Sequence, residues 1–428
     1  MYSAANDAMS FRTLFNVDAV ASLVLHALKA LVALFLNWLI LHHFSVNDFV
    51  VWSVTSSILI VATASDLGIG QYTITTLISE PAETWPRHVG QSLGALVPLA
   101  LLSGVFVCFA VDGPSRFYVI AMAVLLALRI LGLPFIAVLH AKNQFKMRKA
   151  IELAAYAAAA LVIGGIALYG KHVYLALVLL NASFFFGTTL MIVAARRYVS
   201  LSAAWRSVSL AESMHVFRAA LPFTVNNLTG LLTYGGFIWL SSLALPPFQV
   251  AKVAVLHSFV LVNLYQLYDV FLKARQADLA DAKHLAGYAK LNAAVMLLLP
   301  PAFLFGGQQA VALLSGKRLG ITSLEATLYG VFVAFELGNL YVQSVTQVNL
   351  TRIGRLKQYS AVRGAMVAAY LLVGLLSLRS SQTLPVLFGV LSLGSMASFA
   401  YLSLTGKAAI RESGGTPRLT KTRSGTQA

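Results

Sequence analysis

Runs of about twenty apolar residues recur along the whole sequence, and this recurrence limits the folds that the chain can adopt. A helix of that length crosses the roughly 30 Å hydrocarbon core of a bilayer. Hydrophobic residues make up 58% of the 428 positions and charged residues only 11%, whereas an average soluble domain carries about 25% charged residues. A water-soluble fold of this size could not hide so much apolar surface. We therefore expect an all-α, polytopic membrane protein.

Twelve apolar runs, bounded by Gly, Pro and charged residues, predict twelve transmembrane helices in two six-helix bundles. The predicted spans cover residues 15–41, 48–79, 88–111, 115–140, 147–169, 173–195, 216–244, 247–271, 284–306, 321–350, 356–378 and 383–405. The corresponding domains are an N-terminal lobe (1–198), a cytoplasmic linker (199–215), a C-terminal lobe (216–405) and a basic cytoplasmic tail (406–428). Two halves with the same orientation in the membrane are typical of transporters whose substrate path lies between them.

The formal net charge of +16 would indicate a nucleic-acid partner in a soluble protein. In a membrane protein, however, Lys and Arg collect in the cytoplasmic loops and fix the topology. Of the 31 Lys and Arg residues, 23 fall in segments that a cytoplasmic N-terminus places inside, and six fall outside. The basic excess therefore predicts that both termini are cytoplasmic, and we expect no nucleic-acid partner.

Lys29 and Arg129 are the two cations that topology does not explain, because each lies near the middle of its predicted span. Charges inside a bilayer are costly and usually face a bundle interior or a hydrated cavity. The guanidinium group binds phosphate oxygens through its planar fork, and the ammonium group acts as a point charge. We predict that both bind an anionic substrate; the alternative is a structural ion pair, for example between Lys29 and Asp66.

Two carboxylates within the spans, Asp66 and Glu336, are candidates for coupling transport to a proton or sodium gradient. Asn226, Asn227 and Tyr265 are candidates for sugar binding, because amide groups hydrogen-bond to hydroxyls and aromatic rings stack on sugars. Interhelical hydrogen bonds are the alternative for these polar residues. Helix breakers within the spans predict hinges, with close helix packing as the alternative, at Gly68, Gly70, Gly132, Pro134 and Pro222.

Several other chemistries have no support in the sequence. It contains no Walker phosphate-binding loop and no His, Cys and Asp cluster with metal-site spacing. It also offers no large extramembrane loop with the carboxylates or the His and Arg residues that a glycan-building enzyme requires. We therefore predict a transporter without a metal or cofactor, and not an enzyme.

Residues 63–72 (TASDLGIGQY) end the second predicted span. With this stretch, twelve spans in two halves and cytoplasmic termini, the sequence resembles the Wzx-type polysaccharide and O-antigen flippases of the multidrug/oligosaccharidyl-lipid/polysaccharide (MOP) exporter superfamily. The resemblance implies a MATE-like two-lobe fold that moves an undecaprenyl-pyrophosphate-linked oligosaccharide across the bacterial inner membrane by alternating access. It also implies membrane lipids and the polysaccharide polymerase machinery as partners.

The family has a cationic central cavity, which is consistent with Lys29 and Arg129. The C-terminal half departs from this pattern, since its mid-membrane charge is Glu336. Two alternatives remain: a MATE-like multidrug exporter of the same fold, and a membrane-embedded polysaccharide polymerase or ligase. A drug exporter is expected to favour cations, and the two mid-membrane cations argue against it.

Overall fold

The computed structural model is helical throughout the part of the chain that it describes, and no β-strand occurs there. The described residues are 17–63, 66–113, 115–142, 144–170, 172–230, 233, 235–274, 282–352, 356–381 and 383–414. Large apolar side chains such as Phe109 and Leu161 point outward, as they do on helices surrounded by lipid. The predicted all-α membrane fold is confirmed.

The helices follow one another along the chain with short connections. In the N-terminal half they are α2 (Val17–His43), α3 (Val46–Thr63), α4 (Ile69–Ser79), η2 (Ala82–Thr84), α5 (Trp85–Ala110), α6 (Arg116–Leu131), α7 (Leu133–Ala141), α8 (Phe145–Tyr169) and α9 (Val173–Ala195). The short α10 (Leu201–Arg206) follows. The remaining helices are α11 (Leu210–Gly230), α12 (Phe237–Ser242), α13 (Pro247–Leu256), η4 (His257–Leu261), α14 (Val262–Ala274), α16 (Ala282–Leu314), α17 (Ser323–Arg352), α18 (Leu356–Ser381) and α19 (Leu384–Gly414).

Ten helical segments of the described chain are long and apolar enough to cross a membrane. The other two predicted spans correspond to α11 with α12 and to α17. Helix α17 has 30 residues and a length of about 45 Å, but polar residues such as Glu336 and Gln343 lower its hydropathy. The chain is thus a multi-pass membrane protein, and the predicted number of twelve transmembrane helices is an approximate one.

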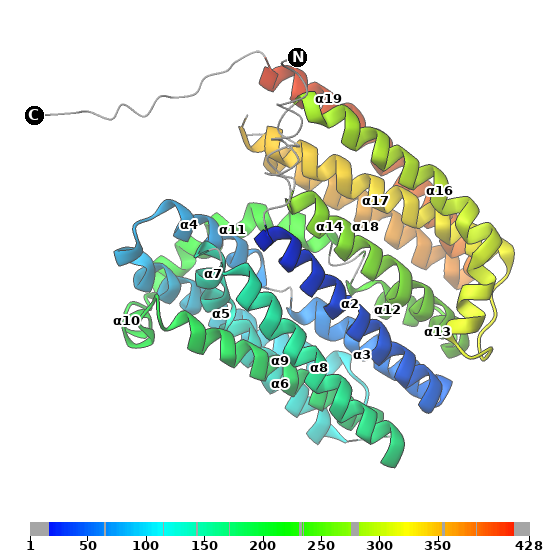
Figure 1. The fold of residues 1–428 in the computed structure, drawn as a ribbon, viewed down its shortest axis with the longest axis horizontal. Helices are drawn as coiled ribbons and strands as arrows, with labels where there is room; N and C mark the ends of the chain where they lie inside the picture. Colours follow the sequence, from blue (N-terminus) through cyan, green and yellow to red (C-terminus); the bar gives the residue numbers. More distant parts are fainter. Residues whose placement is uncertain are drawn as a thin grey trace, which may run out of the picture.

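The helices form two bundles that adjoin along one side (Figure 1). In the N-terminal bundle α2 packs on α8, α5 on α6, and α8 on α9, whereas in the C-terminal bundle α17 packs between α16 and α19. The bundles meet where α3 contacts α12 and α13 and where α2 contacts α14 and η4. Side-chain hydrogen bonds reinforce this contact, because the Ser57 hydroxyl accepts a bond from the Trp239 amide (3.1 Å) and donates to the Gly235 carbonyl.

The segment between the bundles is attached to α5 of the N-terminal bundle. The Ser207 hydroxyl donates to the Pro86 carbonyl (3.0 Å), and the Ser213 hydroxyl donates to the Gln91 carbonyl (3.1 Å). Gly90 permits this approach, since a β-carbon there would overlap the Ala204 carbonyl oxygen in α10. This segment therefore packs as part of the N-terminal bundle.

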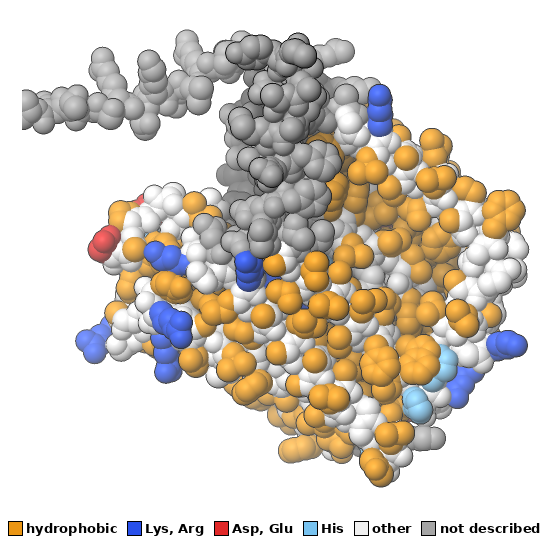
Figure 2. Space-filling view, viewed as in Figure 1, with side chains coloured by type: hydrophobic (Ala, Val, Ile, Leu, Met, Phe, Trp, Pro, Cys, Tyr) orange, Lys and Arg blue, Asp and Glu red, His pale blue; other side chains and the backbone are white. Residues whose placement is uncertain are grey.

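Glu212, near the start of α11, adds a charged contact to the same attachment. Its carboxylate pairs with Arg87 and accepts a hydrogen bond from the Gln91 side chain (2.7 Å). The hydrogen bonds from Arg87 and Gln91 lower the pKa of the Glu212 carboxyl below its ordinary value. Lys and Arg side chains gather around α4, α7 and α10 in Figure 2, and the exposed arginines of this region include Arg87, Arg196, Arg197 and Arg206.

Alanine at Gly90 is expected to weaken the attachment of α10, because a backbone carbonyl cannot rotate away from the new methyl group. Overpacking of this kind costs about 1–3 kcal/mol, so Gly90→Ala should lower the melting temperature of the detergent-solubilised protein by several degrees. Gly165→Ala in α8 is the matched control, since a β-carbon there has open space and alanine favours helix. Equal melting temperatures for Gly90→Ala and the unmodified protein would contradict this account.

Candidate functional site

A partly buried carboxylate in the N-terminal bundle, that of Glu152, binds three cations from two helices. Glu152 on α8 accepts hydrogen bonds from Arg148 Nε at 3.0 Å and from Lys149 Nζ at 3.0 Å. Lys29 on α2 reaches the same carboxylate, with 3.1 Å between Lys29 Nζ and Glu152 Oε2. Arg148 and Lys149 lie four and three residues before Glu152, so one face of α8 carries all three. The Lys29 contact joins α2 to α8 across 123 positions of sequence.

The charges in this group do not balance. Three cations surround one carboxylate, and among the described residues each of the three has only Glu152 as an ion-pair partner. The side chains are not sealed from the surroundings, because Lys29 is 17% exposed, Arg148 27% and Glu152 16%. A net positive charge in a partly desolvated position attracts anions strongly.

Two aromatic rings connect this group to Arg129 on α6. Lys29 Nζ lies 5.3 Å from the centre of the Tyr156 ring, whose centre lies 4.6 Å from that of Phe184. The Arg129 guanidinium lies over the other ring, 4.8 Å from the Phe184 centre, and donates a long bond to Asn181 Oδ1 (3.5 Å). Cation–π contacts of this kind stabilise desolvated cations. We name Lys29, Arg129, Arg148 and Lys149 the cation cluster.

The ion pair between Lys29 and Asp66 that the sequence suggested is wrong. Lys29 pairs with Glu152, while the Asp66 carboxylate accepts the backbone N–H groups of Gly68 (3.1 Å) and Gly70 (3.2 Å). A carboxylate in this position caps the first turn of α4, which favours negative charge at its N-terminus. The predicted coupling role of Asp66 stays a prediction.

Two predicted spans, 48–79 and 115–140, are each broken into two helices, and a glycine lies at each break. Between α3 and α4, Leu67 (φ 48°) and Gly68 (φ 75°) adopt left-handed backbone conformations. Between α6 and α7, Gly132 packs so closely on α9 that a β-carbon would overlap the Thr188 methyl group, and Pro134 lies in the first turn of α7. The predicted hinge roles of Gly68, Gly70, Gly132 and Pro134 stay predictions.

Glu336 is the centre of a separate polar group in the C-terminal bundle. Its carboxylate on α17 accepts hydrogen bonds from the Tyr370 hydroxyl of α18 (3.0 Å) and the Ser395 hydroxyl of α19 (2.5 Å). Asn339, one turn further along α17, donates to Glu336 at 3.5 Å, and its buried Oδ1 atom has no partner among the described residues. Glu336 is only 1% exposed. The structure therefore separates this carboxylate from the cation cluster of the other bundle.

The predicted sugar-binding residues lie on the C-terminal side of the linker. Tyr265 packs with Tyr268 and Phe271 of α14 against Leu340 and Tyr341 of α17. The side chains of Asn226, Asn227 and Pro222 lie outside the described residues, although the backbone of α11 is helical through all three positions. Their predicted roles in substrate binding and bending stay predictions.

Arg318 joins the two bundles at the end of α2. It lies in the connection between α16 and α17, and its guanidinium donates to the carbonyls of Leu41 (2.9 Å), His42 (2.9 Å) and Phe44 (2.8 Å). The last carbonyls of a helix have no partner within the helix and carry partial negative charge, so an arginine is well suited to them. The predicted topology places this contact on the periplasmic side.

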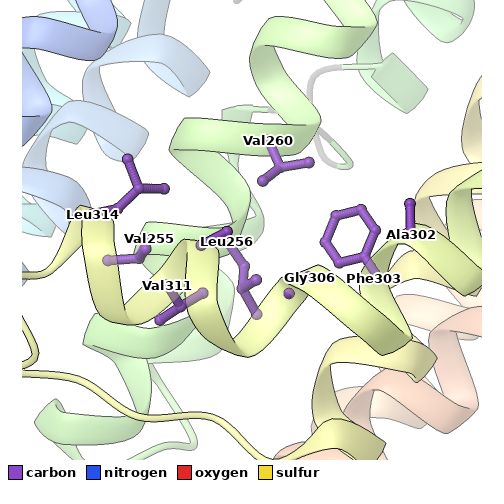
Figure 3. Close-up of a pocket in the computed structure, with 10 residues that line it drawn as sticks. Val255, Leu256, Val260, Ala302, Phe303, Gly306, Val311 and Leu314 are labelled. Carbon is purple, nitrogen blue, oxygen red and sulfur yellow. The ribbon is translucent and has the colours of Figure 1, made fainter.

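An apolar cavity of about 220 Å³ lies between α13, η4 and α16 (Figure 3). Phe303 and Leu256 point into it, and the glycines of α16 leave room along one wall. The lining is Val255, Leu256, Val260, Ala302, Phe303, Gly306, Gly307, Ala310, Val311 and Leu314. A cavity without charged or polar side chains suits hydrocarbon and cannot bind phosphate or sugar.

The central carboxylate of the N-terminal group was missed from the sequence. Glu152, Arg148 and Lys149 fall at the inner end of a predicted span, where cations are explained by topology. Their spacing on one helix face was a usable signal, because Arg and Lys at i–4 and i–3 pair with a Glu. The ion pair between Lys29 and Glu152 could not be recognised from neighbouring residues, because the two are 123 positions apart.

The fold is that of MATE transporters. A multidrug resistance MATE family transporter of the MOP superfamily in an inward-facing conformation is similar, with a TM-score of 0.61 and 14% identity over 93% of this chain and 99% of that one. The eukaryotic MATE transporter AtDTX14 is also similar, with a TM-score of 0.60 and 14% identity over 95% and 98% of the two chains. No protein-family model and no curated protein matches the sequence.

A third similar structure is notable for the polarity of its binding pocket. It is a MOP superfamily transporter from Pyrococcus furiosus, with a TM-score of 0.50 and 13% identity over 93% of this chain and 96% of that one. Its binding pocket is described as having reverse polarity, which suggests a different function for that protein. These structural neighbours are transporters, and together with the apolar helices they define the class of this chain as a multi-pass membrane protein with a MATE-like transporter fold.

Replacing Arg318 with Ala is expected to free the end of α2 from the C-terminal bundle. Hydrogen bonds to charged groups contribute about 1.5–3 kcal/mol each, so losing three should shift a two-state equilibrium at least tenfold. Spin labels at the exposed Leu313, near the end of α16, and the exposed Tyr169, at the end of α8, the helix on which α2 packs, would report a longer or broader distance. The exposed Cys108 is first changed to Ser. Lys317→Ala is the control, and an unchanged Arg318→Ala distance distribution would refute the contact.

Proposed function

We propose that the protein is a flippase that moves an undecaprenyl-pyrophosphate-linked oligosaccharide from the cytoplasmic to the periplasmic leaflet of a bacterial inner membrane, for surface polysaccharide synthesis. The observation that carries the proposal is the cation cluster, in which four partly buried cations accompany a single carboxylate among the described residues. Cations held in a partly desolvated site bind phosphate oxygens far better than water-exposed ones do.

In this proposal the diphosphate lies at the cation cluster while the polyprenyl tail stays in the lipid. Arg129 and Arg148 offer planar forks to phosphate oxygens, and Lys29 and Lys149 offer point charges. Asn226, Asn227 and Tyr265 would contact the sugars from the C-terminal lobe. The lobes alternate between inward and outward access, and the Arg318 contact holds the periplasmic ends together in the inward-facing state.

Glu336 is proposed as the group that couples this cycle to a proton or sodium gradient. A buried carboxylate surrounded by hydroxyl and amide groups exchanges a proton or a cation readily when access changes. Asp66 is the second candidate, at the break between α3 and α4. We propose that no metal or cofactor takes part, that both termini are cytoplasmic, and that the chain works beside a polysaccharide polymerase.

A MATE-like multidrug exporter is the second candidate, and the fold comparisons favour it directly. Such an exporter is expected to take organic cations, and Glu336 would be its attracting charge. The cation cluster argues against this substrate class, and a MOP superfamily transporter with a pocket of reverse polarity provides a precedent within the same fold. A polymerase or ligase has less support, because the similar structures are transporters.

The double variant Lys29→Met/Arg129→Met should abolish most surface polysaccharide in cells that carry it as the only copy, because two of the four cations are lost. Surface polysaccharide is measured on gels, with the protein level in membranes measured by immunoblot. Lys252→Met is the matched control, since Lys252 also lies over an aromatic ring, that of Phe248 (5.4 Å), but outside the cluster. Full export by the double variant would exclude this substrate site.

Glu336→Gln should lower export at least tenfold without lowering the amount of protein in the membrane, because glutamine keeps the hydrogen bonds but cannot exchange a proton or hold a cation. Glu325→Gln on the same helix is the control, because the Glu325 carboxylate caps the start of α17 by accepting a hydrogen bond from the Thr322 amide (2.6 Å). Normal export by Glu336→Gln would remove this residue from the coupling role.

A further inference from the structure

Glu152 occupies the position that an anionic ligand of the cation cluster would take. Its two oxygens accept from three cationic groups, one from α2 and two from its own helix, at 3.0–3.1 Å. These are the distances at which ammonium and guanidinium groups hold phosphate oxygens. Within the described residues, Glu152 is the only carboxylate that pairs with any member of the cluster.

We propose that Glu152 is the resident counter-ion of the empty carrier, which the substrate diphosphate displaces from Lys29 and Lys149. The inference rests on the proposed function, because it takes the ligand to be a diphosphate. A transporter that works by alternating access must return without substrate, and bare cations in a low-dielectric position are costly. Glu152 lowers that cost in the empty state and weakens the bound state, so that the ligand can leave.

The geometry favours displacement at one side of the carboxylate. Arg148 binds Oε1 of Glu152, whereas Lys29 and Lys149 both bind Oε2, so a ligand can take the place of Oε2 while the Arg148 pair persists. Lys29 belongs to a different helix and is held by a single ion pair and by the Tyr156 ring. A diphosphate carries at least twice the charge of the carboxylate and therefore competes effectively for Lys29.

A purely structural role for Glu152 makes the opposite prediction. If Glu152 only positions Lys29 for the ligand, its removal should weaken anion binding. If it competes with the ligand, its removal should strengthen binding. The sign of the change in affinity therefore separates the two roles, and a loss of packing cannot imitate an increase in affinity.

The test measures the binding of inorganic pyrophosphate to the purified full-length protein in detergent by isothermal titration calorimetry. Glu152→Gln should bind pyrophosphate about tenfold more tightly than the unmodified protein, while surface polysaccharide export by the same variant falls. Glu212→Gln is the matched control, because it removes a carboxylate that is also paired with an arginine, outside the cluster. Its affinity for pyrophosphate should be unchanged.

Glu152→Asp provides a second measurement that does not depend on the folding of the Gln variant. Aspartate is one methylene shorter, so it should keep its neighbours on α8 and lose Lys29, and its affinity should lie between those of the unmodified protein and Glu152→Gln. Equal or weaker binding by both variants overturns the inference. If Lys29→Met still weakens binding in that case, the substrate site stands; if no variant changes binding, the proposed function fails as well.

Discussion

The energetic cost of a charge in the membrane is the constraint on which the N-terminal bundle depends. Lys29 is tolerated in α2 because Glu152 neutralises it and Tyr156 covers it, and both groups come from α8. The packing of α2 on α8 brings Glu152 and Tyr156 to Lys29. In the same bundle the Phe184 ring covers Arg129 and stabilises that second cation. Removing Glu152 would leave Lys29, Arg148 and Lys149 partly desolvated without their ion-pair partner, so this group contributes to the arrangement of α2 and α8.

The two bundles hold different buried charges among the described residues. The N-terminal bundle carries the cation cluster around Glu152, and the C-terminal bundle carries Glu336 with hydroxyl and amide donors, together with Arg363, which is bonded to Gln343. The hydrogen-bond and ion-pair partners described for these charged groups come from their own bundles. In the proposed alternating-access cycle, these groups would therefore keep their partners when the halves move. The contacts between the bundles include the packing of α3 on α12 and α13 and of α2 on α14 and η4. The hydrogen bonds of Ser57 and the guanidinium of Arg318 add polar contacts.

Hydropathy and charge were sufficient to predict the class of fold, because the bilayer imposes both on any spanning helix. Positions 29 and 129 were also recognisable, since a mid-membrane cation violates the same rule. The Lys29–Glu152 pair could not be predicted, because its members are 123 residues apart and the nearer carboxylate in sequence, Asp66, is used by its own backbone. The exact geometry of the helix breaks in the second and fourth spans could not be predicted from hydrophobic periodicity. It depends on the backbone conformation of Gly68 and on the packing of Gly132 against α9. Helix α17 was predicted as an apolar run between breakers and charged residues, and its polar residues Glu336, Asn339 and Gln343 are buried.

The guanidinium at the end of α2 has a consequence for water. In the conformation described, the carbonyls of Leu41, His42 and Phe44 are bonded to a side chain from the opposite bundle. If the bundles part at this end, as alternating access would require, the carbonyls and the guanidinium lose each other as partners and must be hydrated instead. Opening would then bind water as well as move helices. The equilibrium between the two states should accordingly depend on water activity, and solutes that are excluded from the opening will favour the closed end.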